Sequence, residues 1–535
     1  MLNAADGASA TPTNQPGGVP PQLLIVTVDS YQAAIALIAP TEGDARFIAS
    51  SPAIADEPHR GIPGALTRLA AQCGFALAAE MIGATIVAGP PIALRVVGEC
   101  DAADAAALAI AERFGVARMV PEPMTPPRNP TRDRSWYWPV IDAWRDGRIE
   151  ALLVVVLPGV LPLWTAQLLT ALDAAPAGGQ AHLLMLASDA DLADTVPADA
   201  IFLPRDEQRA SHLTGALNGL RAARLLRGNA TDAPILARPE ALAVAIRAVS
   251  AACGRPCVYL DVADGTTVMI ADDNGVAVHH DPEIDYARGA VQLFNRYGTA
   301  HVSRWVPFAV SASSLRSWAL RRISAPMAML ADEKDRVIAA GFARATLSMT
   351  LEKIALPIPD GAMWVLGPVL ARLGSHAEAL RIVADLMPSV RVAVVICDDD
   401  DLIPAVGALS VSHPADASSL LAHDALVPTG SVVQASSPGR RARGVMTATL
   451  ANDDRTVTIE VASDTLTAIP CLGSATCSLT SDASSGDRIS VHGGPGGILV
   501  DARRRPLAAV TPNTSRPSVS NRLRPATATN GSSDR

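Results

Sequence analysis

The fold is decided by residues 256–281, PCVYLDVADGTTVMIADDNGVAVHHD. Their pattern predicts three strands joined by two tight turns. An apolar run ends at Asp261, a Gly/Thr turn leads into a second apolar run, and an Asn-Gly pair closes the next hairpin. The stretch 23–50, LLIVTVDSYQAAIALIAPTEGDARFIAS, has the same organisation, and its first apolar run ends at Asp29. Two meanders of one design indicate an internal duplication. If the two copies face each other, both aspartates lie on the floor of one cleft.

Between and after the meanders, strand patterns alternate with helix patterns, which is typical of layered α/β proteins. The segment 151–172 carries no charge and is long enough to cross a bilayer. Pro158, Gly159 and Pro162 interrupt it, however, and they predict a buried strand, a turn and then a helix. We therefore expect no membrane partner.

The composition excludes several classes of function. The formal charge of -9 on 535 residues offers no field that attracts DNA or RNA, so nucleic acid is not an expected partner. Lys334 and Lys353 are the only lysines, and no P-loop motif is present. Seven cysteines are too sparse for a disulfide scaffold, so we expect reduced thiols and a cytoplasmic protein.

Three short stretches carry residue types suited to chemistry. The turn 261–267 can hold a phosphate with its backbone N–H groups and hydroxyls while Asp261 positions hydrated magnesium, but it also reads as an ordinary hairpin turn. The stretch 279–285 contains two adjacent histidines, which point to opposite faces of a strand, and we interpret it as a solvated loop. The acidic run 398–401 suits a hard cation or, alternatively, a strand-end turn that caps the next helix.

A series of motifs in a fixed order resembles the glutamate mutase accessory protein family (MutL/GlmL-like). This family belongs to the superfamily of actin, sugar kinases and heat-shock-chaperone ATPases. The likeness covers most of residues 22–510 and is weak before about residue 152. The stretches that carry it are 261–267, 304–307, 323–326, 365–371, 385–388, 402–409, 430–433 and 496–506.

The resemblance implies an α/β fold with two actin-like (ribonuclease-H-like) lobes around a cleft and a small β-rich C-terminal domain. It implies ATP and magnesium as cofactors, held by Asp29, Asp261 and the residues around them, with both aspartates as metal ligands. The implied cofactor-binding residues are Asp29, Asp261, Gly265, Thr266, Thr267 and Gly367. We expect a disordered tail at 1–21, a first lobe with an insertion at 22–254, a second lobe at 255–425, the C-terminal domain at 426–510 and a second disordered tail at 511–535.

The sequence departs from the family in its phosphate loops. After Asp29 the family's glycine, hydroxyls and lysine are missing, and Tyr31 adds bulk. Ala263 and Asp264 replace two glycines of the second loop, and Pro368 replaces the second glycine of a Gly-Gly pair. Bulk and an extra carboxylate oppose a triphosphate by steric hindrance and repulsion.

Three functions therefore stay open. The resemblance implies an accessory or reactivating ATPase-like factor whose partner is a subunit of a cobalamin-dependent mutase. The altered loops favour a catalytically inactive pseudo-ATPase that serves as a binding or scaffolding module. A small-molecule kinase is the third alternative, although no catalytic residue stands out for it.

Overall fold

The computed structural model describes the chain from residue 23 to residue 503, with gaps, and a short strand at 524–525. Both predicted tails lie outside the described residues, apart from that strand, and so does Asp29. The gaps are 29–31, 42–43, 55–57, 75, 78–80, 89, 121–123, 125–135, 157–162, 176–180, 188–199, 227–232, 264, 287–288, 325–331, 355–357, 360, 388–391, 435–443, 451–455, 462–464, 472–475 and 482–487.

The first lobe is built on a five-stranded sheet of order β10-β4-β1-β2-β3. β1, β2 and β3 form the antiparallel meander that the sequence predicts, and β4 and β10 continue the sheet in parallel beside β1. Ala65 and Leu69 of helix α1 pack on one face of this sheet. The elements are β1 Leu23–Val28, β2 Gln32–Thr41, β3 Asp44–Ile54, α1 Pro58–Cys73, β4 Ile82–Val87 and β10 Ile235–Ala237.

The second lobe repeats this topology, which confirms the two predicted meanders. Its strands β13-β12-β11-β14-β15 have the same order and directions: an antiparallel meander, then two strands parallel to the first. The elements are β11 Cys257–Asp261, β12 Thr266–Asp272, β13 Gly275–Asp281, α7 Gly289–Tyr297, α8 Ala300–Ser303, α9 Ala312–Ser324, α10 Glu333–Lys353, β14 Met363–Leu366, α11 Pro368–Arg372, α12 His376–Leu386 and β15 Val392–Cys397.

Two helices join the lobes through a shared core. α6 (Arg238–Cys253) follows β10, and α13 (Leu402–Ser412) follows β15. Both contribute to one apolar cluster that also contains Ile25 of the first sheet and Met269 of the second. The helices approach so closely that a Cβ on Gly407 would lie 1.8 Å from the carbonyl oxygen of Ala241. A side chain at this position would therefore push the lobes apart.

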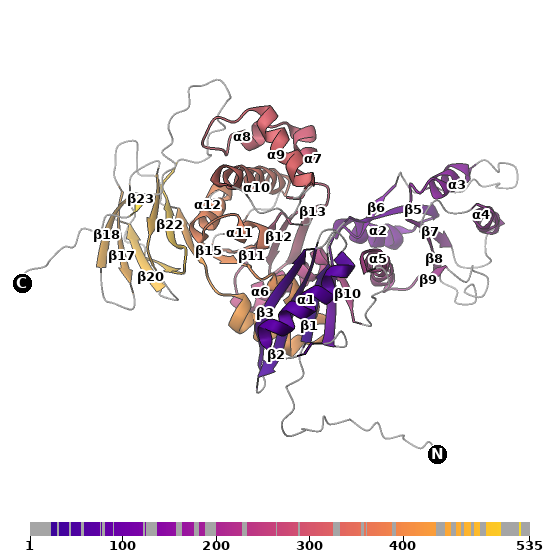
Figure 1. Cartoon of the computed structure of the whole chain (residues 1–535), viewed down its shortest axis with the longest axis horizontal. Helices are drawn as coiled ribbons and strands as arrows, with labels where there is room; N and C mark the ends of the chain where they lie inside the picture. Colours follow the sequence, from indigo (N-terminus) through magenta and orange to yellow (C-terminus); the bar gives the residue numbers. More distant parts are fainter. Residues whose placement is uncertain are drawn as a thin grey trace, which may run out of the picture.

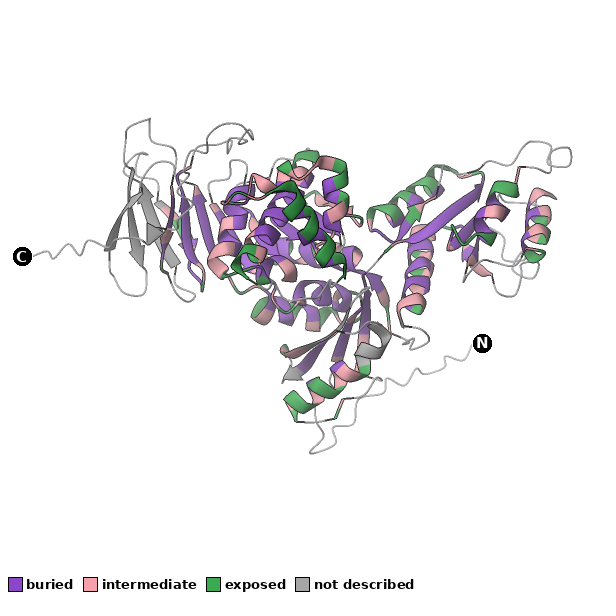
Figure 2. Cartoon of the chain, turned by 45° about the horizontal axis from the view of Figure 1, so that its top comes forward, coloured by how far each residue is buried: buried purple, intermediate pink, exposed green. Residues whose placement is uncertain are grey.

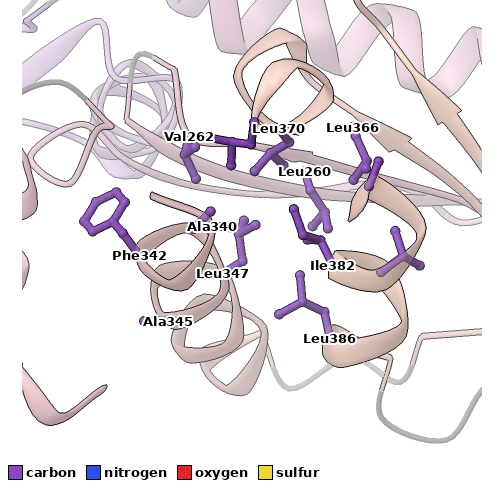
Figure 3. Close-up of a cluster of buried hydrophobic side chains, with 14 of the residues drawn as sticks. Leu260, Val262, Ala340, Phe342, Ala345, Leu347, Leu366, Leu370, Ile382 and Leu386 are labelled. Atoms are coloured by element: carbon purple, nitrogen blue, oxygen red, sulfur yellow. The ribbon is translucent and has the colours of Figure 1, made fainter. Parts of the chain in front are cut away.

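The outer core of the second lobe lies on the other face of its sheet. Leu260 and Leu366 point from neighbouring strands toward Leu347 of α10 and Ile382 of α12 (Figure 3). Figure 2 shows that burial is continuous through the centre of the molecule, while the outer faces of the helices are exposed. The apolar runs seen in the sequence are thus strands buried on both faces.

The predicted insertion lies between β4 and β10 and forms an arm beside the two lobes (Figure 1). Its sheet, β6-β5-β7-β8-β9, is entirely parallel, with α2 and α5 packed together on one face. The uncharged segment 151–172 is strand β7 and helix α4, as predicted, and no helix among the described residues is long and apolar enough to span a bilayer. The elements are β5 Ile92–Gly98, α2 Ala102–Arg113, β6 Ala117–Met119, α3 Trp138–Arg145, β7 Ala151–Val156, α4 Leu163–Asp173, β8 His182–Ala187, β9 Ile201–Pro204 and α5 Arg209–Leu226.

The region after α13 combines helices at the lobe contact with the predicted β-rich part. β16, β22, β19 and β23 extend the sheet of the second lobe, and β18-β17-β20-β21 form a separate four-stranded sheet. Part of the C-terminal domain therefore shares hydrogen bonds with the second lobe. The elements are α14 Pro414–Leu420, η3 Leu421–Ala425, β16 Gly430–Gln434, β17 Gly444–Leu450, β18 Thr456–Val461, β19 Leu466–Ile469, β20 Thr476–Ser481, β21 Arg488–His492, β22 Gly497–Asp501 and β23 Arg524–Pro525.

Candidate functional site

The candidate site lies where three parallel strands of the second lobe end. Asp261 closes β11, Gly367 follows β14 and the acidic loop 398–401 follows β15. Because the carboxyl ends of parallel strands meet at one edge of a sheet, these residues come together. Arg238, the first residue of α6, reaches them from the end of β10 in the first lobe.

Arg238 forms a fork on two aspartates. Its Nη1 and Nη2 atoms donate to Oδ2 and Oδ1 of Asp401 at 2.5 and 2.6 Å, and Nη2 also donates to Oδ2 of Asp261 at 3.1 Å. The side chains of Arg238 and Asp261 are 5% and 2% exposed, whereas that of Asp401 is 18% exposed. We call Arg238, Asp261, Asp398 and Asp401 the arginine site.

The carboxylate of Asp261 has further partners within the protein. Its Oδ1 accepts from the backbone N–H groups of Val262 and Ala263 at 2.8 and 3.1 Å, and its Oδ2 accepts from the hydroxyl of Tyr259 at 3.3 Å. Burial raises the pKa of Asp261 above its usual range, although the charge of Arg238 acts in the opposite direction. With Arg238, four donors surround this carboxylate, which has about four lone-pair positions.

Gly367 is required by this packing. A Cβ at this position would lie 2.5 Å from Cγ of Asp261 and 2.8 Å from the hydroxyl of Tyr259. The backbone after β14 therefore presses directly against the aspartate. Gly367 also precedes α11, which begins at Pro368.

Each residue of the acidic loop contacts a different element. Asp398 accepts from the backbone N–H groups of Leu402 and Ile403 at 2.6 and 3.0 Å, which confirms the predicted cap of the next helix. Burial, and next the charge of Asp401, raise the pKa of Asp398 to about 8. The remaining contacts are Asp400 with the hydroxyl of Ser50 at 3.0 Å, the carbonyl of Asp399 with Arg372, and Asp401 with Arg238.

The two threonines of the predicted phosphate loop also have protein partners. The hydroxyl of Thr266 donates to the carbonyl of Ile284 at 2.6 Å, and the hydroxyl of Thr267 lies 2.9 Å from Nδ1 of His280. Both threonines are buried. Gly265 has a φ of +109°, so this turn requires glycine.

The interpretation of 279–285 as a solvated loop is wrong for its first residues. His280 lies on strand β13, opposite Thr267 of β12, and burial lowers its pKa to about 3. Its ring packs against the insertion: a Cβ on Gly115 would lie 2.6 Å from Cδ2 of His280. Arg113 of α2 also donates to the carbonyl of Val276 at 2.8 Å. The insertion thereby covers the edge strand of the second-lobe sheet, and the loop interpretation failed because this contact is not local in sequence.

The predicted site residues are thus only partly brought together. Asp261 and Gly367 touch, and 265–267 follow Asp261 on the same turn, whereas Asp29 lies outside the described residues. Sequence reasoning missed Arg238, and it named Asp401 only as part of the acidic run 398–401. The available signal for Arg238 was its position directly after a short buried strand and before a proline, which starts a helix.

The groups present do not fit a magnesium-bound nucleotide in this arrangement. Both oxygens of Asp261 are engaged, and the cation beside them is the guanidinium of Arg238. Among the described residues, no group of three or more His, Cys, Asp or Glu side chains is arranged to hold a metal ion. Magnesium at Asp261 stays a prediction.

A second contact joins the lobes through α14 and η3, the elements that follow α13. Arg46 of β3 binds Asp424 through Nε and Nη2, at 2.8 to 3.2 Å, and the backbone N–H of Phe47 donates to the same carboxylate at 2.9 Å. Ser419 donates to the carbonyl of Ala45 at 2.9 Å. The two lobes are therefore joined at the arginine site and again at β3.

Comparisons with known proteins find likeness at the level of structure. No protein-family model and no curated protein matches the sequence. A ROK family glucokinase from Streptomyces griseus, solved with glucose and AMPPNP, aligns at 10% identity over 74% of this chain and 99% of its own, with a TM-score of 0.30. An Aquifex aeolicus Ppx/GppA phosphatase aligns at 10% identity over 67% of this chain and 70% of its own, with a TM-score of 0.21.

These values do not place the chain in either family. The repeated sheet order, the two central helices and the shared core define the class by themselves: an α/β protein with two actin-like lobes. In this chain, Arg238 forms an ion pair with Asp261, the aspartate at the end of β11.

Proposed function

We propose that this protein is a pseudo-ATPase, which uses the two-lobed fold as a binding or scaffolding module and does not hydrolyse ATP. The observation that carries the proposal is the ion pair between Arg238 and Asp261. In the predicted nucleotide site this carboxylate would face magnesium and the phosphates. Here a protein cation neutralises it, and the hydroxyls of Thr266 and Thr267 bond to other protein groups.

The energetic reason is the burial of Arg238. A magnesium ion at Asp261 would have to displace a guanidinium that is 5% exposed, and the nucleotide would then have to compensate a second buried cation. Removing one partner of a buried ion pair costs about 3–5 kcal/mol. This cost opposes binding of the magnesium-bound nucleotide.

An ATPase assay with magnesium tests the proposal. The wild type, Asp261→Ala and the control Asp399→Ala should all release phosphate at the rate of the buffer. Asp399 serves as the control because it lies in the neighbouring loop with a side chain that is 48% exposed. Magnesium-dependent hydrolysis that disappears in Asp261→Ala and persists in Asp399→Ala would overturn the proposal.

A second candidate is an accessory role for a cobalamin-dependent mutase, with ATP and magnesium as cofactors. The observation that favours it is the contact between two of the motifs that carry the family resemblance. Arg503, from the motif at 496–506, donates to Asp385, from the motif at 385–388, at 2.6 Å. Motifs that are far apart in sequence thus form one structural unit.

Binding to a purified mutase tests this role. We expect co-elution with a mutase subunit in size-exclusion chromatography, and faster exchange of a damaged cobalamin when ATP is present. If the chain does not bind the mutase subunits, the accessory role fails. Binding without ATP-dependent exchange would support a scaffolding module instead.

A further inference from the structure

Asp401 has an unusual backbone. Its φ of +59° makes it the only non-glycine residue with a positive φ among the described residues. It precedes α13, but its side chain forms no capping hydrogen bond, because Asp398 caps that helix. The conformation therefore serves another purpose: it directs the carboxylate to Arg238, where it forms the two short bonds described above.

Arg238 has donor capacity that the protein does not use. Among the described residues, its Nε is buried without a hydrogen-bond partner, while Nη1 and Nη2 bind the aspartates. The planar fork of a guanidinium binds carboxylates and phosphates with the same two-point geometry. Two oxygens of a phosphate group would thus fit the same donors in place of the Asp401 carboxylate.

The two aspartates on Arg238 differ in how they are held. Asp261 has three further donors and is 2% exposed, whereas Asp401 is 18% exposed and lies in a loop. Displacement of Asp401 would leave Asp261 in place. The outer carboxylate is consequently the one that a ligand can replace.

We propose that Asp401 is a built-in, displaceable ligand of Arg238, and that this site binds a phosphate-bearing anion without a metal ion. The inference rests on the proposed function, since it assigns a ligand class to the same site. Binding requires only that a phosphate replace one carboxylate on the guanidinium. No covalent bond is made or broken, and magnesium has no role.

Calorimetric titration of pyrophosphate in the presence of EDTA tests this inference. The variant Asp401→Asn removes the competing charge, and it should bind pyrophosphate at least about tenfold more tightly than the wild type. Asp399→Asn is the matched control, because it removes the same charge from the same loop without touching Arg238. It should bind like the wild type. The double variant Asp401→Asn with Arg238→Gln should lose the gain.

The outcomes are decisive in both directions. If Asp401→Asn binds no more tightly than Asp399→Asn, or if the gain survives Arg238→Gln, the inference is wrong. If Asp401→Asn fails to fold in sodium chloride, it is purified in phosphate at equal ionic strength. Rescue by phosphate supports the inference, and failure of the rescue overturns it. Because EDTA removes magnesium, these results are independent of the ATPase assay.

Discussion

Two buried arginine networks contact the second lobe, and they differ in the balance between acidic and basic charge. In the arginine site, Arg238 forms ion pairs with Asp261, which ends β11, and with Asp401, which lies in the loop after β15. In the network around Asp385, Arg344 donates to that carboxylate from Nε at 2.6 Å and Arg503 donates from Nη1 at 2.6 Å. Arg344 and Arg503 also have their own second acids, Glu378 and Asp501.

The electrostatic result is opposite at the two places. Burial raises the pKa of Asp385, but the charges of Arg344, Arg503 and Arg381 outweigh burial and hold it below the usual range. The pKa of Asp261 is raised, because burial there outweighs Arg238. A balanced network stabilises the fold, whereas an excess of buried acid marks a candidate functional site. The Asp385 network joins the C-terminal domain to the second lobe, and the arginine site joins the two lobes.

The largest expected effect contrasts Asp385→Asn with Asp261→Asn. Loss of the Asp385 charge leaves two buried arginines undercompensated and should cost about 3–5 kcal/mol. Loss of the Asp261 charge should cost less, because Arg238 keeps its two bonds to Asp401 and because burial already disfavours the charge of Asp261. Thermal unfolding followed by circular dichroism measures both. Equal losses in the two variants would remove the distinction between the networks.

A smaller effect is expected where the insertion meets the second lobe. Gly115→Ala and Gly254→Ala both place a Cβ at a positive φ, +61° and +57°, which costs about 1–2 kcal/mol in each. Only in Gly115→Ala does the new Cβ also contact a neighbouring side chain, the ring of His280. This overpacking adds about 1–3 kcal/mol to the loss of stability. The difference between the two melting temperatures isolates the contact. Identical melting temperatures would mean that the insertion does not dock there.

The partly buried His280 predicts a pH dependence. Its pKa is about 3 in the folded chain and 6.5 as the ordinary value, so the unfolded chain binds more protons between these values. The contribution of His280 to the free energy of unfolding is fully present above pH 6.5. It falls by about 1.4 kcal/mol for each pH unit between 6.5 and the folded pKa. The raised pKa of Asp398 acts in the opposite direction, so the measurement must isolate the histidine.

The variant His280→Asn provides that isolation. The stability difference between the wild type and His280→Asn should shrink as the pH is lowered from 6.5 toward 4, while Asp398 contributes equally to both proteins. Urea titrations at a series of pH values measure this difference. A difference that does not change with pH would show that His280 is solvated.

The smallest effect concerns the contact between β3 and η3. Arg46 and Asp424 are 46% and 14% exposed, so Arg46→Ala should cost only about 0.2–1 kcal/mol. We expect faster hydrogen exchange in β3 than in the wild type, with no change in β11. Arg145→Ala removes a comparable exposed ion pair in the insertion and serves as the control. Unchanged exchange in β3 would mean that this contact does not hold the lobes together.

Much of the fold could be predicted because its strands are local apolar runs. The two meanders, the helices 239–253 and 332–354 and the strand in 151–172 all follow from period, turn residues and caps. In the insertion, the alternation of strands and helices indicated α/β layers and a buried parallel strand in 151–172, but the edge strands β6 and β9 were not predicted, because they are too short to show a pattern. The extension of the second-lobe sheet by β16 and β22 depends on pairing between residues far apart in sequence.

The site could be predicted in part for the same reason. Asp261 and Gly367 end strands, and a residue at a strand end can be recognised in the sequence. Arg238 comes from the other lobe, so only the assembled fold brings its charge to Asp261. Its effect on magnesium and nucleotide could not be read from spacing.

The central claim is that Arg238 closes the predicted nucleotide site. The most direct test is calorimetric titration of ATP with magnesium into the wild type and into Asp261→Ala. We predict no magnesium-dependent binding up to millimolar ATP in either protein. Micromolar binding to the wild type that is lost in Asp261→Ala would contradict the claim and show that the site accepts the nucleotide.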